Sequence, residues 1–151
     1  MKKETLYLDT SVPSAYYDER DKVIQEETVY FFNKKLMEYD AYISEITVEE
    51  LGKTKEHSRR IQLLALVEGI TILPRTEDAE ELADLYVKNG IIPVKYRLDA
   101  LHIAIAALND IDILVSWNFE HIVKHKTRQM VMGVNILKGY KLIDIVTPQE
   151  I

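Results

Sequence analysis

Three acidic residues and one amide stand where apolar runs end or where buried helices begin. Asp9 closes the apolar run Leu6–Leu8 and is followed at once by Thr10 and Ser11. The other three occupy comparable positions in later segments: Glu50 in ISEITVEEL, Asp99 in RLDALHIAIAAL and Asn118 in DILVSWNFEHI. A strand that ends in an acid places a carboxylate at the edge of a sheet, where open α/β folds bind their ligands. Asp9 therefore indicates a carboxylate with a chemical role.

A functional interpretation of these residues requires that they lie together in the fold. If the strands before Asp9, Glu50 and Asn118 lie side by side, the loops after them meet at one edge, and a helix over 97–108 can bring Asp99 there. Carboxylates in one cleft raise each other's pKa unless a cation neutralises them. The simplest cation is Mg²⁺ or Mn²⁺, which favours oxygen ligands and can activate a water for attack on a phosphodiester.

The composition of the chain excludes several kinds of protein and of metal site. The chain has 151 residues, of which 47% are hydrophobic, and we expect one domain with a core of ordinary size. The absence of cysteine excludes disulfides and thiolate metal sites, and the four histidines have no zinc-site spacing. No apolar run approaches the roughly 20 residues of a membrane span, and no cleavable apolar segment follows the start. We expect a cytoplasmic protein without membrane contact.

Charge is unevenly distributed along the chain. The net charge is −6, yet residues 113–141 carry +4, from one acid and five bases: Lys124, Lys126, Arg128, Lys138 and Lys141. A local basic stretch on an acidic protein suits a partner such as a nucleic acid backbone. A solvated helix end and loop is an equally good interpretation of the same stretch.

Short β-rich runs alternate with segments of helical periodicity, which predicts an α/β fold with a mainly parallel sheet. The predicted strands are 5–9, 41–44, 70–73, 112–116 and 142–146. The predicted helices are 22–38, a short helix that carries Glu50 and is capped by Ser44 or Thr47, 55–68, 77–88 and 97–108. In the short helix, Glu49 falls about 100° away from Glu50 and faces solvent.

These motifs together resemble the PIN domain, and within it the VapC-like endoribonucleases of toxin-antitoxin systems. The resemblance covers nearly the whole chain, through LYLDTSV, ISEITVEEL, RLDALHIAIA, ILVSWNFEHI and VNILKGYKLIDIVTPQEI. It implies one domain over 1–151, a three-layer α/β/α fold with a central sheet of four or five strands, and metal-dependent hydrolysis of RNA. It also implies a cognate antitoxin and a homodimer, with Asp9, Glu50 and Asp99 as ligands of Mg²⁺ or Mn²⁺.

Asn118 departs from the pattern, because the family usually has an aspartate at this position. An asparagine keeps a carbonyl oxygen that can bind a metal weakly or accept from its water, but the site loses one negative charge. Similar departures occur in a subgroup with a Trp-Asn pair. Ser116 matches the small hydroxyl residue that usually stands two positions earlier.

Further residues have a supporting interpretation. Thr10 and Ser44 are expected beside the acids, and His102 lies on the helical face of Asp99, as a residue that tunes the site more readily than as a catalytic base. Lys124, Lys126 and Arg128 are candidates for RNA contacts. Trp117 has two interpretations, stacking on a base and packing beside a strand end.

Three functions from different classes remain open. The preferred one is a metal-dependent endoribonuclease, and the second is a PIN-like module that binds RNA or protein but cleaves poorly, because of Asn118. The third is a phosphatase or phosphotransferase with Asp9 as its nucleophile. It is disfavoured because position 11 is serine, where a second aspartate is expected, and because no Gly-rich phosphate loop is present.

Overall fold

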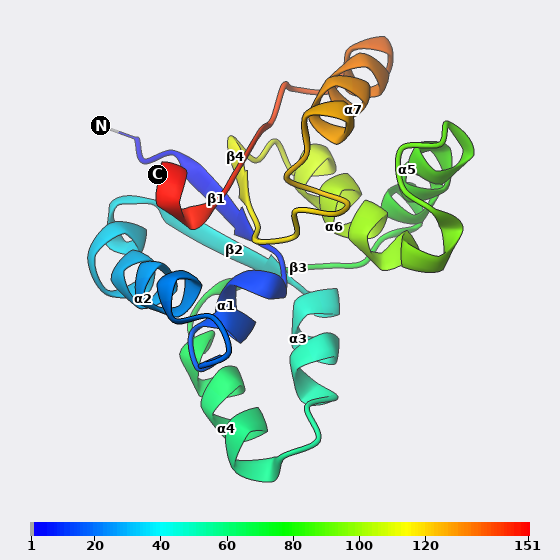
Figure 1. The fold of residues 1–151 in the computed structure, drawn as a ribbon. Helices are drawn as coiled ribbons and strands as arrows, with labels where there is room; N and C mark the ends of the chain where they lie inside the picture. Colours follow the sequence, from blue (N-terminus) through cyan, green and yellow to red (C-terminus); the bar gives the residue numbers. More distant parts are fainter. Residues whose placement is uncertain (1) are drawn as a thin grey trace.

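A computed structural model describes residues 2–151 and shows one sheet of five parallel strands (Figure 1). The strands are β1 (Thr5–Leu8), β2 (Asp40–Ser44), β3 (Thr71–Leu73), β4 (Ile113–Val115) and β5 (Asp144–Val146). Their order is β3-β2-β1-β4-β5, with every neighbouring pair parallel. The first strand of the chain is therefore the central one, and the loops after β2, β1 and β4 leave the sheet at the same edge.

Seven α-helices connect these strands within the described residues. They are α1 (Ser11–Ala15), α2 (Lys22–Tyr30), α3 (Glu45–Gly52), α4 (His57–Leu66), α5 (Glu77–Lys88), α6 (Arg97–Leu108) and α7 (His125–Leu137). A π-helical turn (Phe31–Lys35) and a 3-10 turn (Leu36–Glu38) continue α2, and two more 3-10 turns lie at Val94–Tyr96 and Pro148–Glu150. Within residues 2–151, no helix combines the length and the apolar character that crossing a membrane requires.

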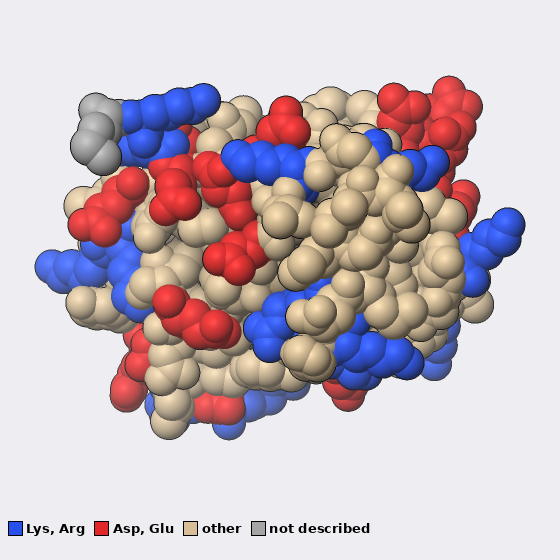
Figure 2. All heavy atoms as spheres, turned by 90° about the horizontal axis from the view of Figure 1, so that it is seen from above, with Lys and Arg blue, Asp and Glu red and all other residues tan. Residues whose placement is uncertain are grey.

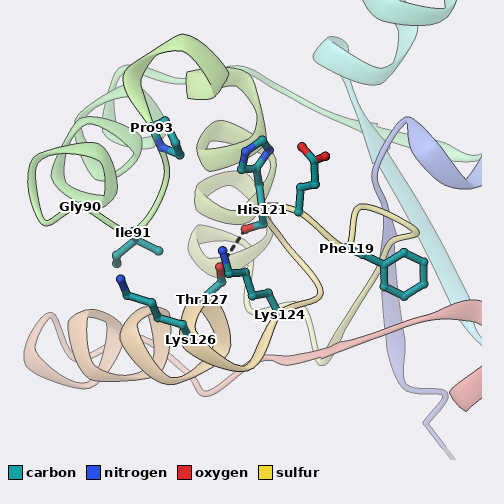
Figure 3. A pocket seen from close by; sticks show the side chains of 9 residues that line it. Gly90, Ile91, Pro93, Phe119, His121, Lys124, Lys126 and Thr127 are labelled. Atoms are coloured by element: carbon teal, nitrogen blue, oxygen red, sulfur yellow. Dashed lines mark hydrogen bonds between the residues drawn. The ribbon is translucent and has the colours of Figure 1, made fainter.

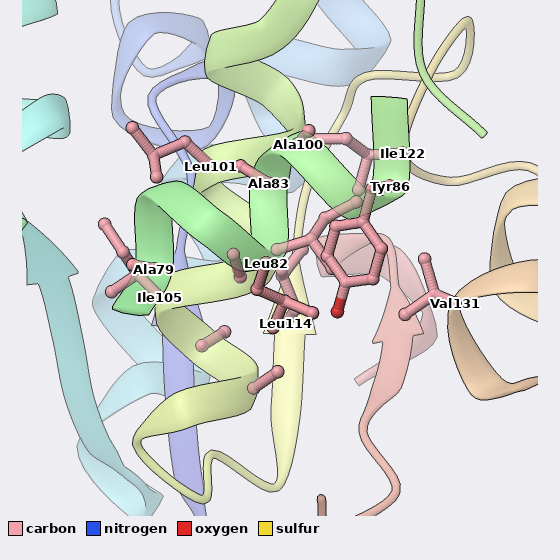
Figure 4. Close-up of a cluster of buried hydrophobic side chains, with 14 of the residues drawn as sticks. Ala79, Leu82, Ala83, Tyr86, Ala100, Leu101, Ile105, Leu114, Ile122 and Val131 are labelled. Carbon is pink, nitrogen blue, oxygen red and sulfur yellow. The ribbon is translucent and has the colours of Figure 1, made fainter. Parts of the chain in front are cut away.

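The helices form a layer on each face of the sheet, because alternate side chains of a strand point to opposite sides. Leu6 and Leu8 are fully buried in one cluster with residues of α1, α3 and α4. Tyr7 is fully buried in the other cluster, which α5, α6 and α7 complete (Figure 4). Residues 100–107 of α6 are at most 2% exposed, so this helix is enclosed on all sides. The predicted three-layer α/β/α fold with a parallel sheet is confirmed.

The element boundaries agree with the sequence pattern in part. All five predicted strands are present, and the helix predicted at 97–108 is α6. The segment 22–38 is helical throughout, but its regular α-helix ends at Tyr30, and Phe31 is fully buried in the π-helical turn that follows. The sequence pattern gives no bounds for α7, because this helix has Gly133 in its interior and begins without a side-chain cap.

A buried hydrogen bond joins α7 to α5. The hydroxyl of Tyr86 donates to Asn135 Oδ1 at 2.5 Å, and both side chains are fully buried. The Nδ2 atom of Asn135 has no hydrogen-bond partner among the described residues. Unpaired buried polar atoms are costly, so the loss of this bond would weaken the attachment of α7.

Replacing this hydroxyl should loosen the attachment of α7. We expect Tyr86→Phe to lower the free energy of unfolding by about 1–3 kcal/mol, because Asn135 Oδ1 then becomes a buried acceptor without a donor. Tyr30→Phe removes a hydroxyl from a ring that is 54% exposed and should change stability by less than about 0.5 kcal/mol. Urea unfolding of both variants measures the difference; equal stabilities would show that the buried bond contributes nothing.

Candidate active site

The three central strands bring the predicted residues to one edge of the sheet. Asp9 follows the end of β1, Ser44 ends β2, and Ser116 follows the end of β4. Because β2, β1 and β4 are adjacent, these positions are neighbours although they are far apart in the sequence. The arrangement expected from the strand pattern is therefore present, with Asp9 at its centre.

Two serine hydroxyls hold the carboxylate of Asp9. Ser11 Oγ donates to Asp9 Oδ1 at 2.5 Å, and Ser116 Oγ donates to Asp9 Oδ2 at 2.7 Å. Each hydroxyl also accepts a backbone N–H, Ser11 from Trp117 and Ser116 from Asn118. Each hydroxyl thus accepts from the backbone and donates its one proton to Asp9.

Burial dominates the electrostatics of Asp9. The residue is only 3% exposed, and burial raises the pKa of its carboxyl above the ordinary value. The charge of His102 and the two serine hydrogen bonds oppose this rise, whereas the negative charge of Asp99 adds to it. Asp99 has this effect because its carboxyl lies at the same edge of the sheet as that of Asp9.

Glu50 reaches the same site from α3, the helix capped by Ser44. The Ser44 hydroxyl accepts from the backbone N–H of Ile46 and thereby starts α3 directly at the end of β2. Glu50 Oε1 accepts from the Thr10 hydroxyl at 2.5 Å and lies 2.8 Å from His102 Nε2. As expected, Glu49 faces solvent and Glu50 faces the site.

A chain of buried polar groups supports Glu50 from behind. His102 is 2% exposed, and its Nδ1 lies 2.5 Å from the hydroxyl of Tyr7, which also hydrogen-bonds Ser44 Oγ at 2.7 Å. Burial acts to raise the pKa of Glu50, but the hydrogen bonds and charge of His102, with the Thr10 bond, lower it overall. A carboxylate at Nε2 requires a proton on that nitrogen, so His102 donates to Glu50.

Asp99 enters from the first turn of α6. Asp99 is the acid of the first turn of α6, where the positive end of the helix dipole favours a negative charge. Its Oδ2 lies 3.1 Å from His121 Nδ1, and it also forms a side-chain hydrogen bond with Asn118. Burial raises the pKa of the Asp99 carboxyl, Asn118 and the histidines His102 and His121 oppose the rise, and Glu50 adds to it.

The amide of Asn118 lies in a turn beside Asp99. Its carbonyl oxygen Oδ1 accepts from the backbone N–H of His121 at 2.9 Å and so closes a turn. The NH₂ group is left for the hydrogen bond to Asp99. The carbonyl oxygen thus already accepts one hydrogen bond, and the amide adds a donor where a fourth aspartate would add a negative charge.

The remaining predicted residues divide into two groups. Lys124 and Lys126 line a cavity beside His121 (Figure 3), whereas Arg128 lies 3.3 Å from the carbonyl of Ile145 and ties α7 to β5. Trp117 donates from Nε1 to Thr28 Oγ1 at 2.9 Å and packs against the core cluster of Leu6 and Leu8. The packing interpretation of Trp117 therefore agrees with the structure.

The sequence pattern predicts no contact with the carboxylates for three residues of the site, and one of them, His121, is predicted only as a possible contact for the RNA backbone. Ser11 stands two positions after Asp9, and that spacing is the signal that would identify it. His121 stands three positions after Asn118 in the same turn. Tyr7 gives no signal, because a tyrosine in a buried strand looks like an ordinary core residue.

The donor chemistry of the site fits a hard divalent cation. Asp9, Glu50 and Asp99 offer only carboxylate oxygens, and burial raises the pKa of two of them, which a positive ion would reverse. Within residues 2–151, no group of three or more Asp, Glu or His side chains is already placed closely enough to hold a metal ion.

Solved structures show the same fold. VapC20 of Mycobacterium tuberculosis, a Sarcin-Ricin loop cleaving toxin, aligns with a TM-score of 0.59 and 14% identity over 92% of this chain and 98% of that one. VapBC2 of Rickettsia felis, bound to a DNA fragment from its promoter, aligns with a TM-score of 0.57 and 11% identity. The alignment covers 95% of this chain and 98% of that one. The toxin-antitoxin protein VapBC-5 of Mycobacterium tuberculosis aligns with a TM-score of 0.52 and 18% identity. The alignment covers 95% of this chain and 98% of that one.

Sequence comparison gives the family. No curated protein matches the chain. The sequence model of the PIN domain, however, matches residues 6–120, which include Asp9, Glu50, Asp99 and Asn118. A match of this length covers most of the chain, and the fold of the three solved structures agrees with it. The chain belongs to the PIN domain family.

Proposed function

We propose that this protein is a metal-dependent endoribonuclease that hydrolyses phosphodiester bonds in RNA. The observation that carries the proposal is the meeting of Asp9, Glu50 and Asp99 at one edge of the sheet, each with its own hydrogen-bond partners. Structural stability alone does not require three acids at one place, because they repel one another. Binding of a cation and a phosphodiester would explain why three acids meet at this place.

Asp9, Glu50 and Asp99 are the residues that would hold Mg²⁺ or Mn²⁺. When bound, the ion would activate a water and neutralise charge on the phosphate. Hydrolysis forms a bond from the water oxygen to phosphorus and breaks the bond to the leaving ribose oxygen, which takes up a proton. Ser11 and Ser116 fix Asp9, His102 and Thr10 fix Glu50, and Asn118 and His121 fix Asp99.

The fold of the VapC structures supports a biological role as the toxin of a type II toxin-antitoxin pair. Two of the three similar structures are VapBC proteins, in which toxin and antitoxin belong together. We propose a cognate antitoxin and a homodimer for this chain as well. Apolar side chains exposed on α2 and on the segment after it offer contact surface for such partners: Val23, Tyr30 and Met37.

RNA would contact only a small part of the surface of this protein. Figure 2 shows acidic and basic side chains mixed over one face, together with a broad area that has neither. The described residues do not form a continuous basic surface there, in keeping with the net charge of −6. We therefore assign the phosphate contacts to the small basic group near His121, formed by Lys124 and Lys126.

Asn118 favours a second candidate, a PIN-like module that binds RNA or protein and cleaves poorly. Its amide adds no negative charge to the site, so metal binding is weaker than with a fourth aspartate. The phosphotransferase interpretation is disfavoured further, because Asp9 is 3% exposed and both of its oxygens accept hydrogen bonds. Such a carboxylate is poorly placed to attack a phosphorus atom.

Cleavage of labelled single-stranded RNA tests the proposed function. We expect cleavage with Mg²⁺ or Mn²⁺ and none with EDTA. Asp9→Asn, Asp99→Asn and Glu50→Gln should each lower the rate at least about 100-fold, because each removes one of few negative oxygens from the metal site. The matched control is Glu49→Gln, which removes an exposed charge from the neighbouring position. Equal loss in Glu49→Gln and Glu50→Gln would contradict the assignment of the site.

Asn118→Asp tests the role of the amide by stability as well as by activity. In EDTA we expect the free energy of unfolding to fall by about 1–3 kcal/mol, because Asp99 loses a donor and gains a like charge. Mn²⁺ should then raise the Tm of this variant more than that of the native protein, because an ion that binds the folded state stabilises it. Thermal unfolding with EDTA and with Mn²⁺ measures both effects.

The control for the added charge is Asn33→Asp, at an exposed position. Its response to Mn²⁺ should equal that of the native protein. A native protein that does not cleave, together with rapid cleavage by Asn118→Asp, would replace the preferred function by the second candidate. An identical response to Mn²⁺ in all three proteins would show that residue 118 does not face the metal site.

A further inference from the structure

A cavity of about 420 Å³ lies beside the carboxylates (Figure 3). Gly90, Ile91 and Pro93, from the connection between α5 and α6, form one wall. The other wall comes from the loop after β4 and the start of α7 (Phe119, Glu120, His121, Lys124, Lys126, Thr127). The volume falls in the range of about 300–1,000 Å³ that small-molecule sites have, so it is large enough for one nucleotide.

His121 connects this cavity to the candidate active site. Its ring lines the cavity, and its Nδ1 lies 3.1 Å from Asp99 Oδ2. On its other side the ring packs on Tyr96, with centroids 4.2 Å apart and planes tilted by 31°. The imidazole is thus held between Tyr96 and Asp99. A ligand in the cavity would lie one side chain away from the carboxylates.

The charge of the lining suits a phosphate group. Lys124 and Lys126 are exposed, and neither forms an ion pair with another described residue. Glu120 is the one acid of the lining, so the two ammonium groups outweigh it. The start of α7, which has no side-chain cap, adds partial positive charge on the same side.

An exposed aromatic ring stands at the other end of the lining. Phe119 is 55% exposed, and in Figure 3 it lies at the end of the cavity opposite Lys126. Trp117, which is anchored to Thr28, lies behind it with ring centroids 6.1 Å apart. Exposed aromatic rings beside lysines form the usual surface for single-stranded nucleic acid, because every base can stack on them.

We propose that this cavity binds one unpaired RNA nucleotide next to the phosphodiester at Asp9, Glu50 and Asp99. Lys124 and Lys126 contact its phosphate, and Phe119 stacks on the adjacent base. The nucleotide must be unpaired, because a base inside a duplex cannot stack on a side chain. This inference rests on the proposed ribonuclease function and adds to it the surface that selects single-stranded RNA.

The lysines are tested by the kinetics of RNA cleavage in Mg²⁺. We expect the double variant Lys124→Ala/Lys126→Ala to raise KM at least about tenfold and to leave kcat within about twofold, because the lysines bind RNA without touching the reacting atoms. The slope of log KM against log salt concentration should fall by about 0.7, the value for the loss of one neutralised phosphate on a single strand. The charge-matched control is Lys22→Ala/Lys138→Ala, at two exposed positions outside the cavity.

The outcomes separate this inference from the function on which it rests. An unchanged KM and salt slope in Lys124→Ala/Lys126→Ala, with normal cleavage by the native protein, would overturn the cavity assignment and leave the ribonuclease intact. Equal effects in both double variants would also overturn it, because charge alone would then explain them. A native protein that cleaves no RNA with either metal would overturn both proposals.

The aromatic contact has its own test. In the native protein, an abasic nucleotide placed beside the mapped cut should raise KM about fivefold or more, because one stacking contact is lost. In Phe119→Ala the abasic substitution should have no further effect, and Phe119→Tyr, which keeps the ring, should behave as the native protein. The same abasic effect in Phe119→Ala as in the native protein would show that the base stacks elsewhere.

Discussion

Asp9 places a carboxylate at the end of the central strand, where it is 3% exposed, and a buried charge must be compensated by hydrogen bonds or by an opposite charge. Two hydroxyls supply the hydrogen bonds, Ser11 from the start of α1 and Ser116 from the end of β4. Both hydroxyls are in turn oriented by backbone N–H groups of the loop after β4. The position of that loop therefore depends on the hydrogen bonds that Asp9 accepts. The loop carries Asn118, His121 and the two lysines.

The other two carboxylates are held by separate groups, and this separation determines the electrostatics. Glu50 receives a donor from His102, and its pKa is lowered overall, whereas burial raises the pKa of Asp9 and Asp99. Glu50 is thus held in its charged form, whereas a cation would favour the charged forms of Asp9 and Asp99. The amide of Asn118 offsets part of the repulsion by donating to Asp99. We expect such a site to favour a divalent ion, because a positive charge would lower the raised pKa of Asp9 and Asp99.

Much of this arrangement follows from local sequence signals. Strands of alternating or continuous apolar residues, each ending in a polar one, predict the parallel sheet and the edge at which Asp9, Glu50 and Asn118 meet. The cap at Ser44 and the spacing to Glu50 select the correct acid over Glu49. Such signals are reliable because strand ends and helix caps are decided by residues close in sequence.

Other features depend on contacts between distant segments and leave no local signal. Tyr7 looks like a core residue, and only the packing of α6 against β1 brings its hydroxyl to His102. The orientation of the Asn118 amide depends on the backbone of His121. The helix α7 begins without a side-chain cap and is held by the hydrogen bonds of Asn135 to Tyr86 and of Arg128 to the carbonyl of Ile145. These contacts decide which groups of the site are free, and one sequence does not specify them.

Diffraction from crystals soaked in Mn²⁺, recorded at the manganese absorption edge, tests the central claim most directly. The account predicts one anomalous peak within ligand distance of Asp9, Glu50 and Asp99, at roughly 2.0–2.2 Å from their oxygens, as for small divalent cations. It also predicts that the peak disappears in crystals of Asp9→Asn. A peak elsewhere on the molecule, or none at this edge of the sheet at saturating Mn²⁺, would contradict the claim that these carboxylates form a metal site.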